Sequence, residues 1–590
     1  MFILSNINKM IKFDIITILL FFHIVLCNNT EDKNKKLMND LYGENKEIKD
    51  KNYDTSLSIE CNNGIFVGTK KGDVISFKGV PYAKPPIGNL RWKNPELPED
   101  SNKIYQAYYF GKSPIQIDWE AILSSYYPQS EDCLYLNIWV NSKDTSTQKA
   151  ILVFIHGGAY SSGGTSEPLY NGDNLVDKFP DIIFISIGYR VGIFGFINLS
   201  SIPGGENYKT SNNLGLLDQI CALKWIQKNI EKFGGDPNKV TLMGQSSGAG
   251  SISLLPLIDE SKGLFKRIIA ESGSLSLTSS LDETKELVKR LLKKSGAKNM
   301  DDLIKLPEAK MKEIDKDICS YDHFAVRDGV VLPLNIYEAY NNNERIKDID
   351  VLLGSNKDEV RYWIRSMGYY TDLLSGKFIY LHGLPILYEN NIKQLNNQDK
   401  EYIDEFMDLL IGKRIWKITE FYNEIVFRIP MTKQAEYHSK AGGNAFVYHW
   451  KYPGEDETMG ACHNVELSYT LNNLEQNIFT GNKVNKELAN KVQEMWVNFA
   501  KNGNPSISGI TWEKYNTDTR KIMILDEKIE MVEGYKDEQR EILEPLLKYY
   551  FNGRFAEMSY NVPQVYRIAF QVICGLSILI FIIAKLKSLF

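Results

Sequence analysis

The chain has 590 residues, of which 43% are hydrophobic and 12% aromatic, enough to build a sizeable core. Its formal net charge is −5, with basic and acidic residues mixed along the chain. A protein that binds nucleic acid through the phosphates presents a strongly basic surface, so this composition excludes nucleic acid as the expected partner. The length suits several average domains, or one large α/β enzyme with insertions.

Both ends of the chain carry an apolar segment. Lys9 and Lys12 precede an apolar run at 15–27 that is followed by polar residues, and this is the layout of a secretory signal peptide. An uncleaved anchor is the alternative. Residues 568–584 are uncharged and mostly apolar, and at ~1.5 Å per residue they are just long enough to span a thin hydrocarbon core.

These segments suggest an order of domains along the chain. More basic residues follow the second apolar segment than precede it, which favours a cytoplasmic C-terminus and an extracellular or lumenal domain. A buried C-terminal helix is the alternative. We predict a signal peptide at 1–27, a disordered polar leader at 28–56, a folded domain at 57–552, a stalk at 553–566, a transmembrane helix at 567–585 and a short tail at 586–590.

The seven cysteines are spread singly, without a C-x-x-C pair. This spacing indicates neither a zinc site nor a dense disulfide framework. The sequence leaves open whether disulfides form among the five that lie outside the terminal apolar segments, which are Cys61, Cys133, Cys221, Cys319 and Cys462.

Short apolar, β-branched runs alternate with helical patterns from about residue 150 onward. This alternation predicts a mostly parallel sheet flanked by helices. A hairpin is expected to open the domain, with arms at 65–67 and 72–77, and a helix is expected at 537–549 near its end. The expected strands are 134–140, 151–155, 182–187, 240–243, 267–271, 351–354 and 444–450, and a helix at 216–233 is expected to stop at the glycine pair that follows it.

The stretch at 233–250 contains the pattern Gly244-Gln245-Ser246-Ser247-Gly248 directly after a short apolar strand. A strand, a sharp turn and a helix make up the nucleophile elbow, in which glycines allow close backbone approach and the turn lifts the serine hydroxyl clear of the sheet. A lone G-x-S-x-G pattern is weak evidence, because Gly/Ser turns are common.

A serine nucleophile needs a histidine to take its proton and a carboxylate to orient that histidine. In α/β-hydrolases these follow in the order serine, acid, histidine, each on a loop after a strand. The strand at 351–354 runs into a loop that offers two carboxylates, Asp358 and Glu359. His463 lies in a later loop and is the best candidate for the base, whereas His449 lies within a strand pattern and is expected in the sheet.

The chemistry also requires N–H groups aimed at the oxyanion, each worth roughly 3 to 4 kcal/mol in acyl transfer. The sequence His156-Gly157-Gly158-Ala159 follows the strand at 151–155 and is typical of the H-G-G-x loop. Taken alone it could be a Gly-rich turn. The elbow, the glycine loop, the acid loop and the histidine loop occur together in the required order, which predicts a serine hydrolase.

Longer motifs extend this interpretation. They read FKGVPYA at 77–83, EDCLYLNIW at 131–139, the elbow at 233–248, and FAKNGNP at 499–505. Through them the chain, from about Gly64 to Phe551, resembles the type B carboxylesterase and cholinesterase family.

The resemblance implies the α/β-hydrolase fold: a mostly parallel central sheet flanked by helices, with an N-terminal antiparallel hairpin and large helical insertions. It implies that Ser246 is the nucleophile, Glu359 rather than Asp358 the acid, and His463 the base. The oxyanion donors map to Gly158, Ala159 and Ser247, with Gly157 opening the turn. Two ion pairs are also implied, Arg91 with Glu131 and Arg190 with Asp218.

The chain departs from the family pattern in four places. Ala159 replaces the third glycine of the loop, and Gln245 stands where the family usually has glutamate. Leu123 takes the position of the tryptophan that stacks on choline in cholinesterases, with Trp119 off register, and cation binding needs such an aromatic face. Ser113 takes the place of the family's disulfide partner of Cys133.

We therefore expect a membrane-tethered serine carboxylesterase that acts on neutral esters of short or medium acyl chain and needs no metal or cofactor. A non-catalytic adhesion protein of the neuroligin type is the alternative from another class. A lipase and a cholinesterase are the alternatives among enzymes. The physiological ester and the oligomeric state stay open at this stage.

Overall fold

The computed structural model describes residues 43–116, 127–144, 148–318, 323–366, 373–476, 478–482, 484–555 and 558. The predicted signal peptide at 1–27, transmembrane helix at 567–585 and tail at 586–590 lie outside these residues. Among the helices of the described ranges, none is long and apolar enough to cross a bilayer.

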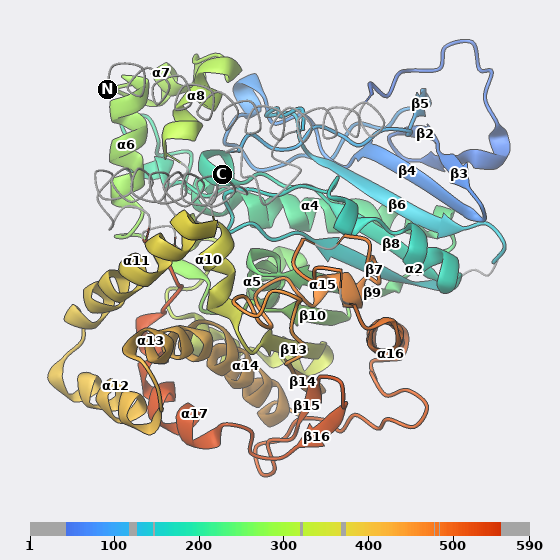
Figure 1. Cartoon of the computed structure of the whole chain (residues 1–590). Coiled ribbons are helices and arrows are strands. Elements are labelled where there is room, and N and C mark those ends of the chain that lie inside the picture. The colour runs from blue at the N-terminus through green and yellow to red at the C-terminus, as the bar shows by residue number, and fades with distance from the viewer. Residues whose placement is uncertain are drawn as a thin grey trace, which may run out of the picture.

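A sheet of eleven strands forms the centre of the molecule (Figure 1). Its order is β16-β15-β14-β13-β10-β9-β7-β8-β6-β4-β3. Neighbours from β8 to β15 are parallel and the outer pairs are antiparallel, so the predicted, mostly parallel sheet is confirmed. The strands are β3 (Thr69–Lys71), β4 (Val74–Pro81), β6 (Tyr135–Asn141), β7 (Lys149–Ile155), β8 (Ile182–Ile187), β9 (Gly235–Gln245), β10 (Arg267–Glu271), β13 (Asp350–Asn356), β14 (Ala445–Trp450), β15 (Ile522–Leu525) and β16 (Glu530–Val532).

Two smaller sheets accompany the central one. The first joins β1 (Ser58–Cys61), β2 (Gly64–Val67) and β5 (Ile104–Gln106), and the second joins β11 (Thr278–Ser280) and β12 (Ala325–Arg327). The N-terminal hairpin is present, but its predicted pairing is wrong. The turn at Gly72 joins β3 to β4, whereas β2 pairs with β1. The sequence of β3, Thr-Lys-Lys, carries no apolar side chain that could reveal a strand.

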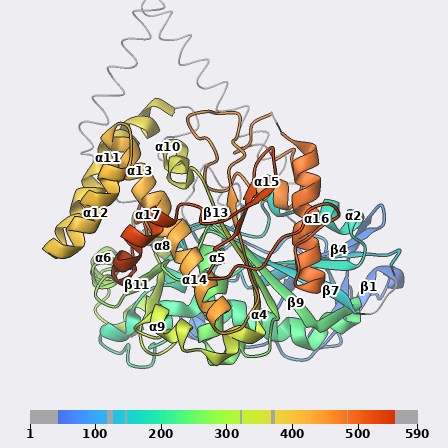
Figure 2. The same cartoon turned by 90° about the horizontal axis from the view of Figure 1, so that it is seen from below.

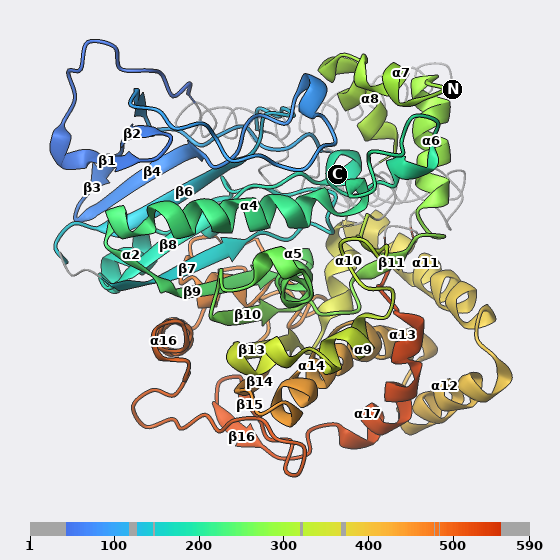
Figure 3. The same cartoon turned by 180° about the vertical axis from the view of Figure 1, so that it is seen from behind.

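The central strands are buried on both faces, as parallel strands covered by helices must be. Along β7, Ile151, Val153 and Ile155 pack into one apolar cluster with α4 (Leu214–Asn229), α5 (Ser247–Leu254) and α14 (Ile429–Lys440). The alternate residues Leu152 and Phe154 pack into another cluster with α2 (Asp173–Lys178) and α16 (Lys486–Asn502). Figure 3 shows α4 and α5 lying in front of the strands when the molecule is seen from behind.

The remaining helices form insertions around this core. The segment α6 to α8 has its own apolar cluster around Trp92. Helices α10 to α14, which include the π-helix η12 (Asn423–Arg428), gather at the side of the sheet opposite β3 (Figures 1 and 2). Their bounds are α3 (Gly192–Gly195), α6 (Lys285–Ser295), α7 (Met300–Ile304), α8 (Glu308–Ile318), α9 (Ile336–Asn341), α10 (Tyr362–Ser366), α11 (Leu373–Lys393), α12 (Asn397–Leu409), α13 (Arg414–Tyr422), α15 (Leu467–Thr470) and α17 (Asp537–Leu543).

Both implied ion pairs are present and buried. Arg91 donates to the two carboxylate oxygens of Glu131 at 2.6 and 2.5 Å, and Arg190 does the same to Asp218 at 2.8 and 2.6 Å. Removing one partner of such a pair would leave an uncompensated buried charge.

The four described cysteines outside the terminal segments are buried free thiols: Cys61, Cys133, Cys221 and Cys462. Cys319 lies outside the described residues. Cys133 therefore forms no disulfide with any of the described cysteines. Ser113 forms an isolated β-bridge with Gln129.

The packed part of the chain extends into the range predicted as a stalk. Phe555 is 4% exposed and Met558 is fully buried. The ring of Phe555 lies 4.1 Å from that of Trp363, measured between centroids. A β-carbon added to Gly383 of α11 would lie 2.6 Å from the carbonyl oxygen of Met558, so these two parts of the chain are in close contact.

Candidate active site

Ser246 lies at the turn between β9 and α5, as the elbow pattern predicts. Its backbone has φ 57° and ψ −126°, a conformation that costs a non-glycine residue about 1 to 3 kcal/mol. The turn is held by two backbone hydrogen bonds: Ser246 N–H donates to the carbonyl of Glu271 at 2.8 Å, and Gly250 N–H donates to the carbonyl of Ser246 at 2.9 Å. The serine is half-buried, whereas its neighbours in the motif are buried.

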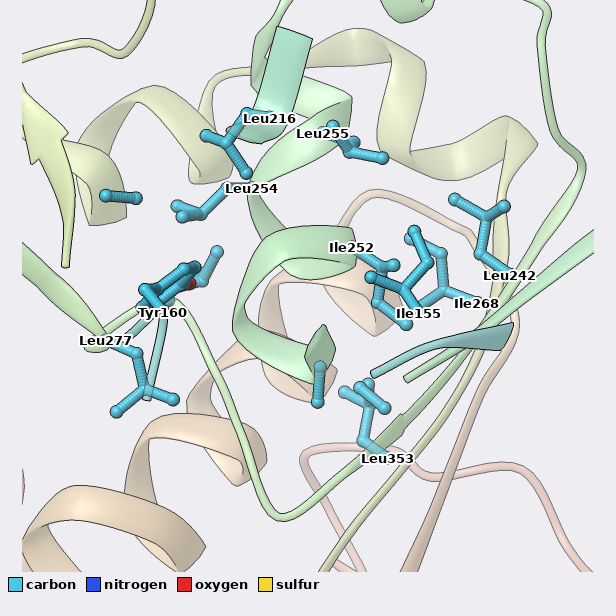
Figure 4. Close-up of a cluster of buried hydrophobic side chains, with 14 of the residues drawn as sticks. Ile155, Tyr160, Leu216, Leu242, Ile252, Leu254, Leu255, Ile268, Leu277 and Leu353 are labelled. Carbon is cyan, nitrogen blue, oxygen red and sulfur yellow. The ribbon is translucent and has the colours of Figure 1, made fainter. Parts of the chain in front are cut away.

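The glycines of the motif are required by close packing. A β-carbon on Gly248 would lie 2.1 Å from the carbonyl oxygen of Ile155, and one on Gly244 would lie 2.6 Å from the backbone of Gly248. Figure 4 shows that Ile252 of α5 packs among Ile155, Leu242 and Ile268 of the neighbouring strands. The apolar core thus fixes the strained turn in place.

The glycine loop follows β7 and lies directly against the elbow. A β-carbon on Gly157 would lie 2.9 Å from the Cβ of Ser246. Gly158 and Ala159 both have positive φ, 115° and 53°, and no described hydrogen bond is donated by either N–H. Ser247 is the first residue of α5, so its N–H has no acceptor within the helix. The four residues predicted for the oxyanion site therefore lie on the loop and the helix end that meet at Ser246.

His156 supports this loop and is not placed to act as a base. Its Nδ1 lies 2.8 Å from the carbonyl of Gly157, and its ring stacks on Tyr189 at 4.4 Å. The hydroxyl of Tyr189 donates to the carbonyl of His156 at 2.7 Å. Burial lowers the pKa of His156 to about 4, so the ring stays neutral at physiological pH.

Glu359 and His463 are in contact, although they are far apart in sequence. The Nδ1–H of His463 donates to Oε2 of Glu359 at 2.6 Å, and both side chains are buried. The N–H of Asn356 donates to the other carboxylate oxygen at 2.7 Å. A carboxylate at Nδ1 keeps the proton on that nitrogen and leaves the lone pair on Nε2, which is the tautomer that a general base needs.

The neighbouring carboxylate turns to other partners. Asp358 lies 3.1 Å from Arg361 and accepts a hydrogen bond from the N–H of Ala461 at 3.0 Å. Of the two carboxylates that the loop offers, Glu359 is therefore the one that contacts His463.

Aromatic rings surround the imidazole. Tyr362 and Trp363 of α10 lie 5.7 Å from the ring of His463, and Phe427 of η12 lies 5.2 Å from it. These rings come from the inserted helices, so the insertions complete the wall around the histidine. They fix the plane of the imidazole and keep bulk water away from it.

Two buried carboxyl groups behind the histidine were missed in the sequence. Glu466, at the start of α15, accepts hydrogen bonds from the side chains of Asn356 and Ser272. Glu271, the last residue of β10, accepts one from Trp496 Nε1 at 2.8 Å. Burial, with the charge of Glu359, raises the pKa of Glu466 to about 7, and burial beside Glu466 raises that of Glu271 well above its usual value. The one available signal was a glutamate directly after the apolar run at 268–270 of the predicted strand.

The side chain of Gln245 reaches the base as well, which the sequence did not predict. Its Nε2 lies 3.1 Å from Nε2 of His463. Because Nδ1 of the imidazole carries the proton that points to Glu359, Nε2 is the acceptor, and the glutamine amide is the donor. Within the described structure, Ser246 and His463 are not joined by a hydrogen bond.

The prediction that His449 belongs to the sheet is confirmed. It lies in β14 and is buried, and burial, reinforced by Lys536, holds its pKa well below the usual value. Leu123 and Trp119, on which the argument about choline depends, lie outside the described residues.

A parallel sheet with a serine at a strained strand-to-helix turn, a glycine loop after the neighbouring strand, and an acid and a histidine on later loops defines an α/β-hydrolase. The family model for the Carboxylesterase family matches residues 55–543. The chain belongs to this family, and it is a carboxylic ester hydrolase.

Known relatives agree with this assignment. The chain is similar to the para-nitrobenzyl esterase of Bacillus subtilis (strain 168), with 31% identity over 82% of this chain and 98% of that protein. It is 27% identical to acetylcholinesterase 1 of Caenorhabditis elegans over 75% of this chain and 78% of that one. Among solved structures, carboxylesterase EST55 of Geobacillus stearothermophilus superposes with a TM-score of 0.73, at 28% identity, over 82% of this chain and 99% of that chain.

Proposed function

We propose that the protein is a serine carboxylesterase that works through a Ser246–His463–Glu359 triad and an acyl-enzyme intermediate. The observation that carries this proposal is the 2.6 Å contact between His463 Nδ1 and Glu359, made next to a strained serine elbow. Buried ion-pair contacts of this kind also occur for structural reasons, but here the remaining nitrogen of the imidazole faces the residues of the elbow.

In the first half of the reaction, the Oγ of Ser246 attacks the ester carbonyl while Nε2 of His463 takes the hydroxyl proton. The N–H groups of Gly158, Ala159 and Ser247 stabilise the oxyanion of the tetrahedral intermediate. His463 then gives the proton to the alkoxy oxygen, and the alcohol leaves. In the second half, water attacks the acyl-enzyme with His463 as base, and the proton returns to the Oγ of Ser246 as the acid is released.

The proposed substrates are neutral esters of short or medium acyl chain. The elbow carries the neutral amide of Gln245 where a carboxylate would attract a cationic alcohol group, and a cation needs a charge or an aromatic face to bind. The similarity to a para-nitrobenzyl esterase and to carboxylesterases supports this class of substrate over choline esters.

We also propose that residues 567–585 tether the enzyme to a membrane, with the catalytic domain on the extracellular or lumenal side, after removal of residues 1–27. The apolar composition of the two segments supports this. We expect the full chain to sediment with membranes after carbonate washing. Recovery of the chain in the soluble fraction would contradict the proposed tether.

The test of the activity is hydrolysis of p-nitrophenyl esters from acetate to decanoate by the full chain, beside the Ser246→Ala variant. We expect turnover that disappears in the variant, with the highest kcat/KM at short or medium chain length. A maximum at the longest esters would indicate a lipase. A folded wild-type protein that is no more active than the variant would favour a non-catalytic binding protein.

A further inference from the structure

In the proposed reaction, Nε2 of His463 accepts the proton of Ser246, and in this structure Nε2 already accepts a hydrogen bond from another residue. Nε2 of the imidazole receives a hydrogen bond from the side-chain amide of Gln245 at 3.1 Å. We propose that Gln245 is a positioning residue for the base: its neutral amide holds His463 as the neutral imidazole, and so sets the acid side of the pH range in which the enzyme works. The inference rests on the proposed function, because it assigns a role within the same site.

The amide is confined where it lies. Gln245 is the last residue of β9, it is 2% exposed, and its backbone is in register with Glu271 of β10. On the side of the glycine loop, the space ends at Gly157, whose added β-carbon would lie 3.0 Å from Oε1 of Gln245. The side chain therefore fills the space between the loop and the imidazole, and it has a fixed partner on the base.

An amide and a carboxylate at position 245 would have opposite effects on the protonation state of His463. An N–H that donates to Nε2 stabilises the neutral imidazole, because only the neutral ring has a lone pair there. A carboxylate would accept a hydrogen bond from the protonated ring and stabilise the imidazolium, which cannot act as a base. One atom of difference between glutamine and glutamate therefore changes which protonation state the site favours.

The effect of the residue at position 245 also depends on the other charged groups near the imidazole of His463. Two carboxyls interact with it: Glu359 of η11 (Glu359–Arg361) on Nδ1, and Glu466 at the start of α15. Glu271 of β10 lies beside Glu466. Asp358 is paired with Arg361. Tyr362, Tyr448 and Cys462 are further titratable groups of this region, and burial raises the pKa of the last two well above their usual values. A further negative charge at position 245 would thus add to that of Glu359, which already favours the imidazolium, whereas the raised pKa values of Glu271 and Glu466 keep these two carboxyls more protonated.

The test compares the pH dependence of kcat/KM for the wild-type chain, Gln245→Glu and Gln245→Met, from about pH 5 to about pH 9, with p-nitrophenyl butyrate. For Gln245→Glu we expect the midpoint of the acid limb to rise by about 1 to 3 pH units, as for an opposite charge within hydrogen-bond reach. For Gln245→Met, which keeps the shape and removes the donor, we expect a smaller rise.

Two controls separate this effect from others. Gln434 is fully buried in α14 and donates to Tyr340 at 3.0 Å, away from His463, so Gln434→Glu makes the same chemical change without reaching the base. It should leave the acid limb in place. Because Glu466 itself titrates, the three proteins are also compared in a Glu466→Gln background, where the difference between them should persist.

A second readout does not depend on turnover. The low-field proton resonance of the Nδ1–H of His463, identified by its loss in His463→Gln, reports the protonation of the ring as pH is varied. Its titration midpoint should rise in the order wild type, Gln245→Met, Gln245→Glu. Coincident midpoints in folded proteins, by kinetics and by resonance, would overturn the proposal. A wild-type chain without esterase activity would overturn the proposed function instead, while the resonance still tests Gln245.

Discussion

Two adjacent carboxylates, Asp358 and Glu359, have different partners in the folded protein. Glu359 touches His463 and Asp358 touches Arg361. The loop pattern alone offered both residues, because both lie on the predicted loop and differ by one methylene, and the resemblance to the family implied Glu359. Their partners are set by where the loop at 460–463 crosses them, which is a long-range contact that local sequence does not encode.

The first prediction concerns this pair. Glu359→Gln keeps the size of the side chain but removes the charge that holds the tautomer of His463, so kcat is expected to fall by about 10³ to 10⁴ with little change in KM. Asp358→Asn is the matched control and should lose less than about tenfold. Steady-state kinetics on p-nitrophenyl butyrate measure both. Equal losses in the two variants would contradict a specific role for Glu359, and a larger loss in Asp358→Asn would assign that role to Asp358.

A second prediction concerns Gly157. In Gly157→Ala the new methyl would lie 2.8 Å from the carbonyl oxygen of Gln245 and 2.9 Å from Cβ of Ser246, so the glycine loop must shift away from the elbow. We expect kcat to fall by about 10² to 10³, the loss typical of a displaced oxyanion donor. Gly443→Ala, whose methyl would approach the carbonyl of Ile346 at 3.2 Å, serves as a control for stability. Unchanged kcat in Gly157→Ala would contradict the placement of the loop.

At the scale of elements, η12 links the acid loop to the inserted helices. Its first residue, Asn423, accepts a hydrogen bond from the N–H of Val360 at 3.0 Å and donates to the carbonyl of Lys357 at 3.1 Å. Phe427 of the same π-helix packs on His463. A π-helix bulges the chain at such points and often marks functional sites, so this element positions both the acid and the base.

A third prediction tests how η12 is anchored. Glu424 is fully buried, and although burial alone would raise its pKa, Arg428 and Lys536 lower it to about 2. A carboxyl whose pKa is lowered on folding stabilises the protein above its unfolded pKa, and this stability is lost as the pH falls through about 4.5 toward about 2. Glu424→Gln should therefore lower the free energy of unfolding by on the order of 3 kcal/mol at neutral pH.

The measurement is the thermal midpoint of the wild type and of Glu424→Gln as the pH is lowered. The difference between the two proteins should be largest at neutral pH and shrink below about pH 4. The surface ion pair Lys491–Glu487 offers a comparison, because Glu487→Gln should change the midpoint little. A difference for Glu424→Gln that does not vary with pH would show that the charge is not what anchors the element.

At the scale of the whole molecule, the parts predicted correctly are those with local signals. The strand at 267–271 matches β10 residue for residue. The helix predicted at 216–233 is α4, which ends at Asn229, followed by a 3-10 helix at Ile230–Phe233 that stops at Gly234, where φ is 82°. The helix at 537–549 is instead α17 followed by a 3-10 helix from Glu544. Strands β15 and β16 were missed, because strands of four and three residues are too short to show a period of alternating side chains.

Contacts between distant segments were the least predictable. Gln245 and Glu271 end neighbouring strands and lie side by side, yet nothing in either segment reveals the other. The register of β9 against β10 places Gln245 on Nε2 of His463 and places Glu271 beside Gln245. Only the assembled sheet brings them together.

A fourth prediction concerns the thiols. Burial raises the pKa of Cys61 and Cys221 to about 12 and that of Cys133 and Cys462 well above the usual value, so these thiols are un-ionised and unreactive at neutral pH. We expect a thiol reagent to label all four only after unfolding, as followed by peptide mass spectrometry, and a reductant to leave the thermal midpoint unchanged. A disulfide-linked peptide that contains Cys133 would contradict this prediction.

The burial of Phe555 and Met558 has a mechanical consequence. These side chains hold the end of the described chain against Trp363 and α11, and Trp363 in turn faces His463. Tension applied beyond Met558 therefore reaches the wall of the active site before it reaches the sheet. A load applied to the C-terminal end should therefore be transmitted to His463, whereas a load applied to the N-terminal end, at the β1 sheet, should not.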